Sequence, residues 1–138
     1  MSLTEASATI EGITEITIAS YFATINREDF DQTAALFAKD GEMLAPFEKP
    51  IVGREKITAY LAKEATGMKL LPKQGIRETE DDLEIFKVLG KVRTSLFSVN
   101  VAWYFTLNIE RQITTARIKL LASPQELLNL QNKKDKLA

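Results

Sequence analysis

The chain contains neither cysteine nor histidine. Without cysteine it can form no disulfide, and it offers no thiolate as a nucleophile or a metal ligand. Without histidine it lacks the side chain that most readily transfers protons near neutral pH and that most often binds metals. Enzymes can transfer protons with carboxylates and tyrosine instead, but catalysis is the weaker expectation. We therefore expect that the protein is not an enzyme and that it holds no metal.

Long apolar runs and an excess of one charge are missing as well. No apolar run approaches the ~18 residues that a membrane-spanning helix needs. The 18 Lys and Arg residues oppose 19 Asp and Glu residues, and the basic residues are scattered outside the tail, which argues against a nucleic-acid surface. The opening MSLTEASATIEG lacks the basic and apolar regions of a signal peptide. A cytoplasmic location is the expectation.

What is present indicates one globular domain. The chain has 138 residues, of which 45% are hydrophobic and 27% are charged, enough for a real core. We expect a flexible N-terminus over 1–12, a domain over 13–122 and a C-terminal helix with its tail over 123–138.

Helical patterns dominate the first half of the chain. Apolar residues at helical spacing predict helices over 13–26, 29–41 and 54–67, with the second helix ending at a left-handed cap at Gly41. A short strand is predicted over 42–47.

From residue 68 onward the apolar period changes to two. The pattern predicts four long strands over 68–79, 83–99, 100–110 and 112–122, with turns near 81–82, 98–100 and 110–111. Three helices followed by a large antiparallel sheet indicate an α+β domain. Such a sheet buries one face only if the helices fold across it, and a long curved sheet closed in this way tends to leave a conical pocket.

The only tryptophan lies in a strictly alternating stretch, SLFSVNVAWYFTLN. Val101, Trp103 and Phe105 share one face of the predicted strand, and Ala102 and Tyr104 share the other. A buried indole needs a partner for its N–H group. The alternation therefore raises the question of what Trp103 binds.

The C-terminal stretch SPQELLNLQNKKDK has a sharp helix signal. Ser123 is a good N-cap, Pro124 suits the first helical position, and Glu126 completes a capping box. Its leucines give it an apolar side, so this short helix must dock on something.

Three stretches carry a resemblance to a known family: YFATINREDFDQTAALFAKDGEMLAPFEKPIVGREKI, GKVRTSLFSVNVAWYFTLN and LLASPQELLNL. They resemble the C-terminal domain of the orange carotenoid protein of cyanobacteria, which has the nuclear-transport-factor-2-like (NTF2-like) fold. The likeness runs from about Gly12 to Leu130, and we expect no helical N-terminal domain before it. We therefore expect the chain to be similar to stand-alone homologues of that C-terminal domain.

The resemblance implies a binding site for a ketocarotenoid of the canthaxanthin or echinenone type. In the family a tyrosine and a tryptophan donate hydrogen bonds to the keto oxygen, and the matching residues are Tyr21 and Trp103. Without the family, both would more simply be core aromatics with incidental partners. Further positions match or adjoin ligand-lining ones: Ile25, Val52, Met68, Leu70, Phe97 and Ile118.

The resemblance also implies partners. Stand-alone members form homodimers that share one carotenoid, take it from membranes such as the thylakoid surface, pass it to apo helical carotenoid proteins, and serve in photoprotection by quenching singlet oxygen. A diameter of roughly 35 Å for a chain of this length suits such sharing, since a carotenoid of similar length would protrude from one copy. The C-terminal helix is expected to cover or uncover the pocket or the outer sheet face. Because cysteine is absent, we expect no redox control of the dimer.

Two other functions stay open from the residues alone. Isomerase-like and cyclase-like enzymes of this fold pair a carboxylate with a tyrosine, so Asp40, Glu42 or Glu64 with Tyr21 or Tyr60 are conceivable acid–base sets. A dimeric interaction module with an empty apolar pocket is the third possibility. The resemblance matches Glu64 to a residue of a cross-domain salt bridge, but without the partner domain we expect an exposed, unpaired side chain.

Overall fold

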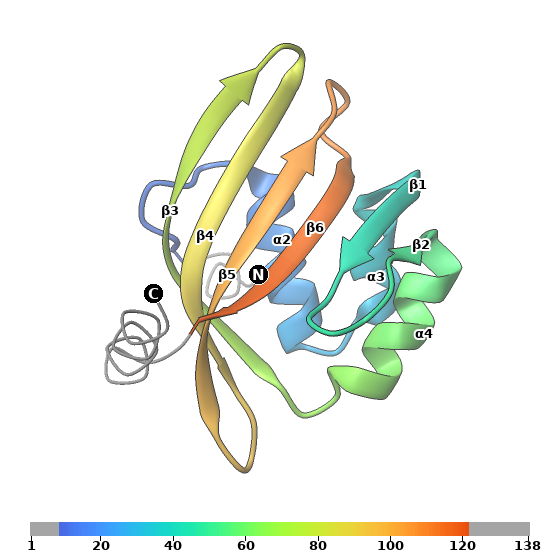
Figure 1. The fold of residues 1–138 in the computed structure, drawn as a ribbon, viewed down its shortest axis with the longest axis vertical. Helices are drawn as coiled ribbons and strands as arrows, with labels where there is room; N and C mark the ends of the chain where they lie inside the picture. Colours follow the sequence, from blue (N-terminus) through green and yellow to red (C-terminus); the bar gives the residue numbers. More distant parts are fainter. Residues whose placement is uncertain (1–8, 122–138) are drawn as a thin grey trace, which may run out of the picture.

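The computed structural model describes residues 9–121, and in this part of the chain three helices pack across one face of a curved six-stranded sheet (Figure 1). The elements in chain order are α2 (Ile16–Asn26), α3 (Phe30–Ala35), β1 (Phe37–Leu44), β2 (Ile51–Val52), α4 (Arg54–Glu64), β3 (Lys69–Glu80), β4 (Leu83–Arg93), β5 (Ser98–Leu107) and β6 (Ile113–Leu121). The α+β fold with helices ahead of a large sheet is confirmed.

The sheet is mixed, so the prediction of an antiparallel sheet is wrong at one pairing. The strand order is β2-β1-β6-β5-β4-β3, and β3 to β6 form an antiparallel meander. β1 lies parallel to β6, with Met43 opposite Ala116. These two strands come from opposite halves of the chain and no hairpin joins them, so local pattern does not constrain their relative direction.

The predicted helix over 29–41 is helical only in its first half and continues as strand from Phe37. Helix α3 ends at Ala35, and β1 starts at Phe37 and runs through Gly41, which is not a left-handed cap. Phe37 is buried opposite Ile113, and the Ile113 N–H donates to the Leu36 carbonyl at 2.9 Å. Pairing with β6 thus overrides a weak local helical pattern. The strand predicted over 42–47 is the second half of β1.

The turn between β4 and β5 also differs from its predicted place. It lies at Thr94–Phe97, and Ser98 and Asn100 belong to β5. The Thr94 hydroxyl accepts hydrogen bonds from the N–H groups of Leu96 and Phe97, both at 3.1 Å. A threonine that stabilises a tight turn in this way is a weak sequence signal next to the asparagine and glycine of common hairpins. In Figure 1 this turn projects beyond the helices.

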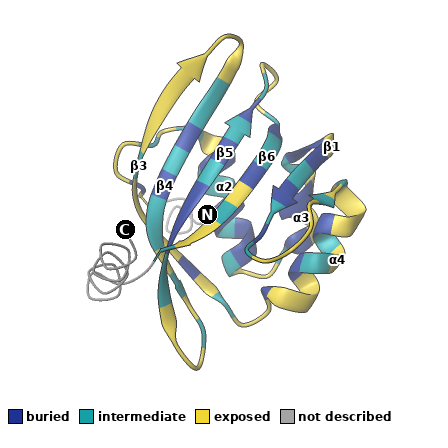
Figure 2. Ribbon diagram, viewed as in Figure 1, coloured by how far each residue is buried: buried dark blue, intermediate teal, exposed yellow. Residues whose placement is uncertain are grey.

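Strand β5 runs through the centre of the core, and its middle residues Val101, Ala102 and Trp103 are all buried (Figure 2). Val101, Trp103 and Phe105 are buried on the face that the helices cover. On the neighbouring strand β6, Arg117 and Lys119 are exposed, as their alternation predicts. The sheet thereby presents aromatic side chains to the helices on its inner face, while Arg117 and Lys119 lie on the opposite face.

The described chain begins at residue 9 and ends at residue 121, close to the predicted domain boundaries. Ile10 is buried, and Glu11 pairs with Gln74 at the edge of β3, so part of the segment predicted to be flexible lies against the sheet. The predicted helix over 123–138 lies outside the described residues. Between residues 9 and 121, no helix is long and apolar enough to cross a membrane.

Candidate functional site: an apolar cavity

A cavity of ≈ 410 Å³ lies between the inner sheet face and helices α2 and α4. Its walls are almost entirely apolar, and the few lining side chains with polar atoms belong to Tyr21, Tyr60, Glu64, Thr94 and Trp103. The remaining lining residues are Ile25, Met43, Pro46, Leu61, Ala65, Met68, Leu70, Val92, Phe97, Val99, Val101, Ile118 and Leu120. A cavity of this size and character suits an apolar ligand.

The exposure of the lining residues increases from the floor of the cavity to its mouth. Tyr21 and Trp103 are both only 1% exposed, whereas Phe97 and Leu120 are about half exposed and Glu64 is exposed. A ligand can therefore reach the two aromatic residues from solvent only by passing along the apolar walls.

Aromatic packing fixes the orientation of the two floor residues. The Tyr21 ring meets the Phe105 ring edge to face at a centroid distance of 4.8 Å, and Phe22 meets Trp103 in the same way at 4.7 Å. Such edge-to-face pairs add about 0.5–1.5 kcal/mol beyond area burial and disfavour rotation of the rings. Helix α2 and strand β5 thus hold the two side chains as rigid units.

Both floor residues have an unused hydrogen-bond donor. Neither the Tyr21 hydroxyl nor the Trp103 indole N–H bonds to any other residue within 9–121. Burial, and secondarily Tyr60 nearby, raises the pKa of the Tyr21 phenol well above its usual value. The hydroxyl therefore stays protonated as a donor. Two such donors in an apolar cavity are suited to a ligand with a carbonyl or ether oxygen.

The structure brings most of the predicted site residues together. Val52 is the exception, since it lies exposed on the short strand β2 and does not line the cavity. The residues that do line it are Tyr21, Ile25, Met68, Leu70, Phe97, Trp103 and Ile118. The sequence reasoning missed Met43 and Val101 as lining residues, although their apolar alternation in strands could have indicated an inward position.

Of the three carboxylates considered for catalysis, only Glu64 lines the cavity. Asp40 is exposed on β1, and Glu42 pairs with Val52 at the sheet edge. Glu64 makes no ion pair with another described residue. The pKa of Tyr60 is raised by partial burial and by Glu48 and Glu64. The described residues also contain no cluster of acidic side chains that could hold a metal.

Helix α2 is tied to the cavity wall at its last residue. The Asn26 side chain donates to the Leu70 carbonyl at 2.9 Å and accepts from the Leu70 N–H at 2.7 Å. One side-chain amide thereby pairs with the backbone of β3 as a neighbouring strand does. Leu70 itself is buried and lines the cavity.

The sequence of the chain is similar to those of two known proteins. The orange carotenoid-binding protein of Limnospira maxima is 45% identical over 126 residues, which cover 88% of this chain and 40% of that protein. The homologue in a Synechocystis species is 43% identical over 125 residues, covering 87% of this chain and 39% of that protein. The chain is a homologue of the C-terminal, NTF2-like domain of the orange carotenoid-binding proteins. It spans about 40% of the length of these relatives.

A solved structure supports the same relationship. The orange carotenoid protein of an Anabaena (Nostoc) species, which binds canthaxanthin, is 42% identical and superposes with a TM-score of 0.80 over 88% of this chain and 40% of that chain. No protein-family model matches the chain. More distant NTF2-like folds include an epoxide hydrolase/cyclase-like enzyme at 18% identity and a TM-score of 0.63, which shows shared architecture alone.

Proposed function

We propose that this homologue of the orange carotenoid-binding proteins binds a ketocarotenoid, of the canthaxanthin or echinenone type, with one keto ring at the floor of the cavity. The observation that carries the proposal is the pair of unused donors, Tyr21 and Trp103, at the buried end of an apolar cavity. Their natural acceptor is a carbonyl oxygen on an otherwise apolar molecule. The names of the relatives, and canthaxanthin in one of them, support this choice.

The floor and the walls contribute differently to binding. Two neutral hydrogen bonds contribute about 1–3 kcal/mol together, and they select keto rings over unsubstituted ones because a missing acceptor leaves both donors unpaired. Burial of the ring and polyene against the walls contributes about 25 cal/mol per Å². We expect the walls to supply most of the affinity and the floor most of the specificity.

The visible absorption spectrum of the protein loaded with canthaxanthin tests the proposal. We expect a band shifted to the red of free canthaxanthin, and a smaller shift with roughly 2- to 10-fold weaker binding in Tyr21→Phe and Trp103→Phe, because each loses one hydrogen bond. Tyr104→Phe is the matched control, since it removes the same hydroxyl from the outer face of β5.

A protein that stays colourless after incubation with canthaxanthin would contradict carotenoid binding. A coloured protein whose band is unchanged in both floor variants would show that the ligand is held elsewhere or without these donors. No described residue favours the acid–base alternative, because Glu64 is the single carboxylate at the cavity and it lies at the exposed mouth.

We further propose that two copies share one carotenoid across their cavity mouths. A volume of ≈ 410 Å³ lies at the small end of the roughly 300–1,000 Å³ of ligand pockets, so a carotenoid protrudes from it. Exposed apolar residues lie at the mouth. Phe47 is 96% exposed and follows the lining residue Pro46, and Leu96 is 86% exposed and precedes the lining residue Phe97. Leu120, also a lining residue, is about half exposed. We call Phe47, Leu96, Phe97 and Leu120 the apolar rim.

The charges near the rim favour a second copy as its partner. Glu48 and Lys49 follow Phe47, and Lys63 precedes Glu64 at the mouth. A rim with both signs of charge can be self-complementary across a two-fold axis, whereas an anionic membrane surface attracts clusters of positive charge. Membrane contact is therefore proposed to be transient, during uptake of the carotenoid.

Transfer of the carotenoid to helical carotenoid proteins, and photoprotection by quenching singlet oxygen, complete the proposed role. The absorption spectrum also follows this step, because a pigment that moves to an apo helical acceptor changes its protein environment and its band. A loaded protein that retains its pigment in the presence of excess apo acceptor would contradict the carrier role and leave the binding proposal intact.

A further inference from the structure

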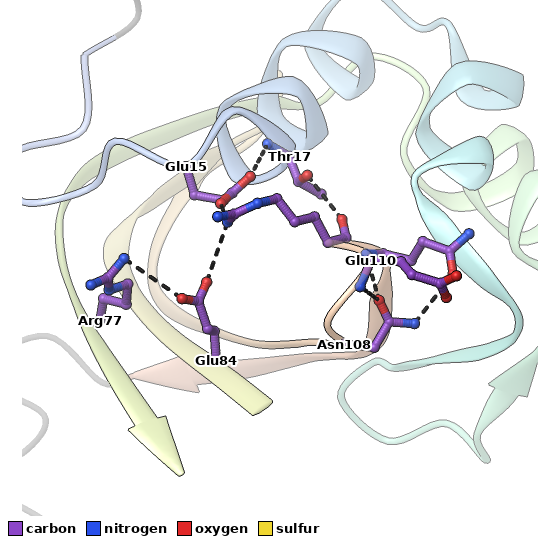
Figure 3. A network of polar contacts seen from close by, with 8 residues as sticks. Glu15, Thr17, Arg77, Glu84, Asn108 and Glu110 are labelled. Atoms are coloured by element: carbon purple, nitrogen blue, oxygen red, sulfur yellow. Dashed lines mark hydrogen bonds and ion pairs between the residues drawn. The ribbon is translucent and has the colours of Figure 1, made fainter. Parts of the chain in front are cut away.

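A network of polar contacts lies at the N-terminal end of α2 (Figure 3). Glu15 is the N-cap of the helix, and one of its carboxylate oxygens accepts from the Thr17 N–H at 3.2 Å while the other pairs with the Arg111 guanidinium. The same guanidinium nitrogen lies 3.4 Å from Glu84 on β4, which Arg77 on β3 approaches at 3.6 Å. A glutamate is an unusual N-cap, and here its length lets it serve the helix and the arginine together.

The backbone of Arg111 makes a second contact with the same helix turn. Arg111 lies in the turn between β5 and β6 with a φ of 63°, a conformation uncommon for residues other than glycine. Asn108 holds this turn, since its side-chain oxygen accepts from the Gln112 N–H at 3.0 Å. The Arg111 carbonyl then accepts from the Thr17 hydroxyl at 3.0 Å. One residue therefore holds the first turn of α2 at two points.

We propose that Arg111 is a positioning residue for the ligand donor Tyr21, acting through its contacts with Glu15 and Thr17. This inference rests on the proposed function of the cavity. Arg111 follows β5, which carries Trp103, and it binds the start of α2, which carries Tyr21. It thus links the two elements whose donors must meet one oxygen atom.

Helix geometry shows why this link matters at the cavity floor. Thr17 and Tyr21 are four residues apart, so they lie on the same face of α2 about one turn from each other. A slide of α2 along its axis therefore moves the Tyr21 hydroxyl relative to the Trp103 N–H on β5. Hydrogen bonds keep their heavy atoms within about 2.5–3.2 Å, so a shift near 1 Å suffices to lose one of the two bonds to a shared acceptor.

The burial of Glu15 indicates that its contact with Arg111 stabilises the start of α2 more than an exposed ion pair would. The Glu15 side chain is 8% exposed, whereas the Arg111 side chain is 58% exposed. The carboxylate thus lies in a largely dry position and receives both a backbone N–H and the guanidinium, an arrangement stronger than an exposed pair. Loss of the Arg111 guanidinium therefore leaves the Glu15 carboxylate buried with one partner fewer.

The test compares three variants loaded with canthaxanthin. Arg111→Gln should shift the visible band toward that of Tyr21→Phe and weaken binding roughly 2- to 10-fold, the effect of losing one neutral hydrogen bond. Arg111→Lys keeps the positive charge beside Glu15 and should restore most of the wild-type band. Arg77→Gln is the matched control: it removes a guanidinium of similar exposure that pairs with Glu84 but makes no hydrogen bond or ion pair with α2 among the described residues.

A double-mutant cycle separates positioning from a general loss of stability. If Arg111 acts through Tyr21, Arg111→Gln should shift the band little further in a Tyr21→Phe background. An equal shift in both backgrounds, or an unchanged band in Arg111→Gln, would overturn the inference while leaving carotenoid binding intact. A wild-type protein that binds no canthaxanthin would overturn both. Should Arg111→Gln fail to fold, Glu15→Gln replaces it, because the amide oxygen still accepts from Thr17 while the ion pair is lost.

Discussion

The phenol of Tyr21 is only 1% exposed and its hydroxyl is unused, so its ionisation should be visible in stability. Burial raises the pKa of Tyr21 above its usual 10.0, so near neutral pH the folded and unfolded states are both protonated and stability does not depend on this group. Above pH 10 the unfolded phenol loses its proton while the folded one keeps it. The free energy of unfolding should then fall by up to about 1.4 kcal/mol per pH unit from this residue.

Urea unfolding between about pH 8 and pH 11, in the wild type and in Tyr21→Phe, measures this contribution. The variant should show a shallower decline above pH 10, because other groups that titrate there are common to both proteins. Equal slopes would mean that the Tyr21 hydroxyl is less buried than the structure places it.

At the residue scale, the sequence predicted the position of Trp103 better than its role. Alternation alone indicates that Trp103 faces the core, since strand side chains change face at every residue. Helical spacing likewise indicates only that Tyr21 is buried, and the ligand-binding role proposed for both residues came from the resemblance. Met43 was missed as a lining residue because its place beside the cavity depends on the pairing of β1 with β6.

At the scale of elements, the β4–β5 hairpin turn presents two residues of the apolar rim and depends on one hydroxyl. Thr94→Val removes the oxygen that accepts from the Leu96 and Phe97 N–H groups while nearly conserving the side-chain shape. We expect faster amide hydrogen exchange at these two positions, since their donors lose their partner, and a stability loss of about 0.5–1.5 kcal/mol.

Thr94→Ser is the matched control, because it retains the hydroxyl and should retain protection of both amides. Comparable exchange in the valine and serine variants would mean that the turn is held by its backbone contact, the Thr94 N–H to the Phe97 carbonyl at 2.8 Å. This turn was predicted four residues too late, since the strand-like composition continues through it without a glycine or proline.

The largest error in predicted elements has a long-range cause. The stretch over 36–44 has helix-compatible residues such as Ala38 and Lys39, and its strand conformation depends on pairing with β6, more than seventy residues away, and with the short strand β2. Local propensity is a weak guide where tertiary pairing decides the conformation. The periodic strands β3 to β6, whose signals are long and local, were largely placed correctly.

At the scale of the whole molecule, the apolar rim should control association of loaded copies. Replacing Phe47 and Leu96 together by serine removes the two most exposed large apolar side chains beside the mouth. Sedimentation equilibrium of the canthaxanthin-loaded protein should then show at least a roughly tenfold weaker dimer, because buried aromatic and aliphatic anchors carry most of an interface's energy.

Ile76→Ser provides the comparison, since Ile76 is also more than half exposed but lies on β3 outside the cavity lining. A loaded wild type that sediments as a monomer would contradict the shared carotenoid. Equal weakening by Ile76→Ser would place the interface on the outer sheet face instead of the rim.

The pairing of Asn26 with Leu70 has a consequence for how this chain can diverge. Aspartate at that position offers two acceptors and no donor, glutamine is one methylene too long, and serine cannot reach both backbone groups at once. Substitutions among leucine, isoleucine and methionine in the apolar walls cost little stability. Natural variation should therefore reshape the cavity, and with it the preferred cargo, long before it changes the amide that joins the helix to the wall.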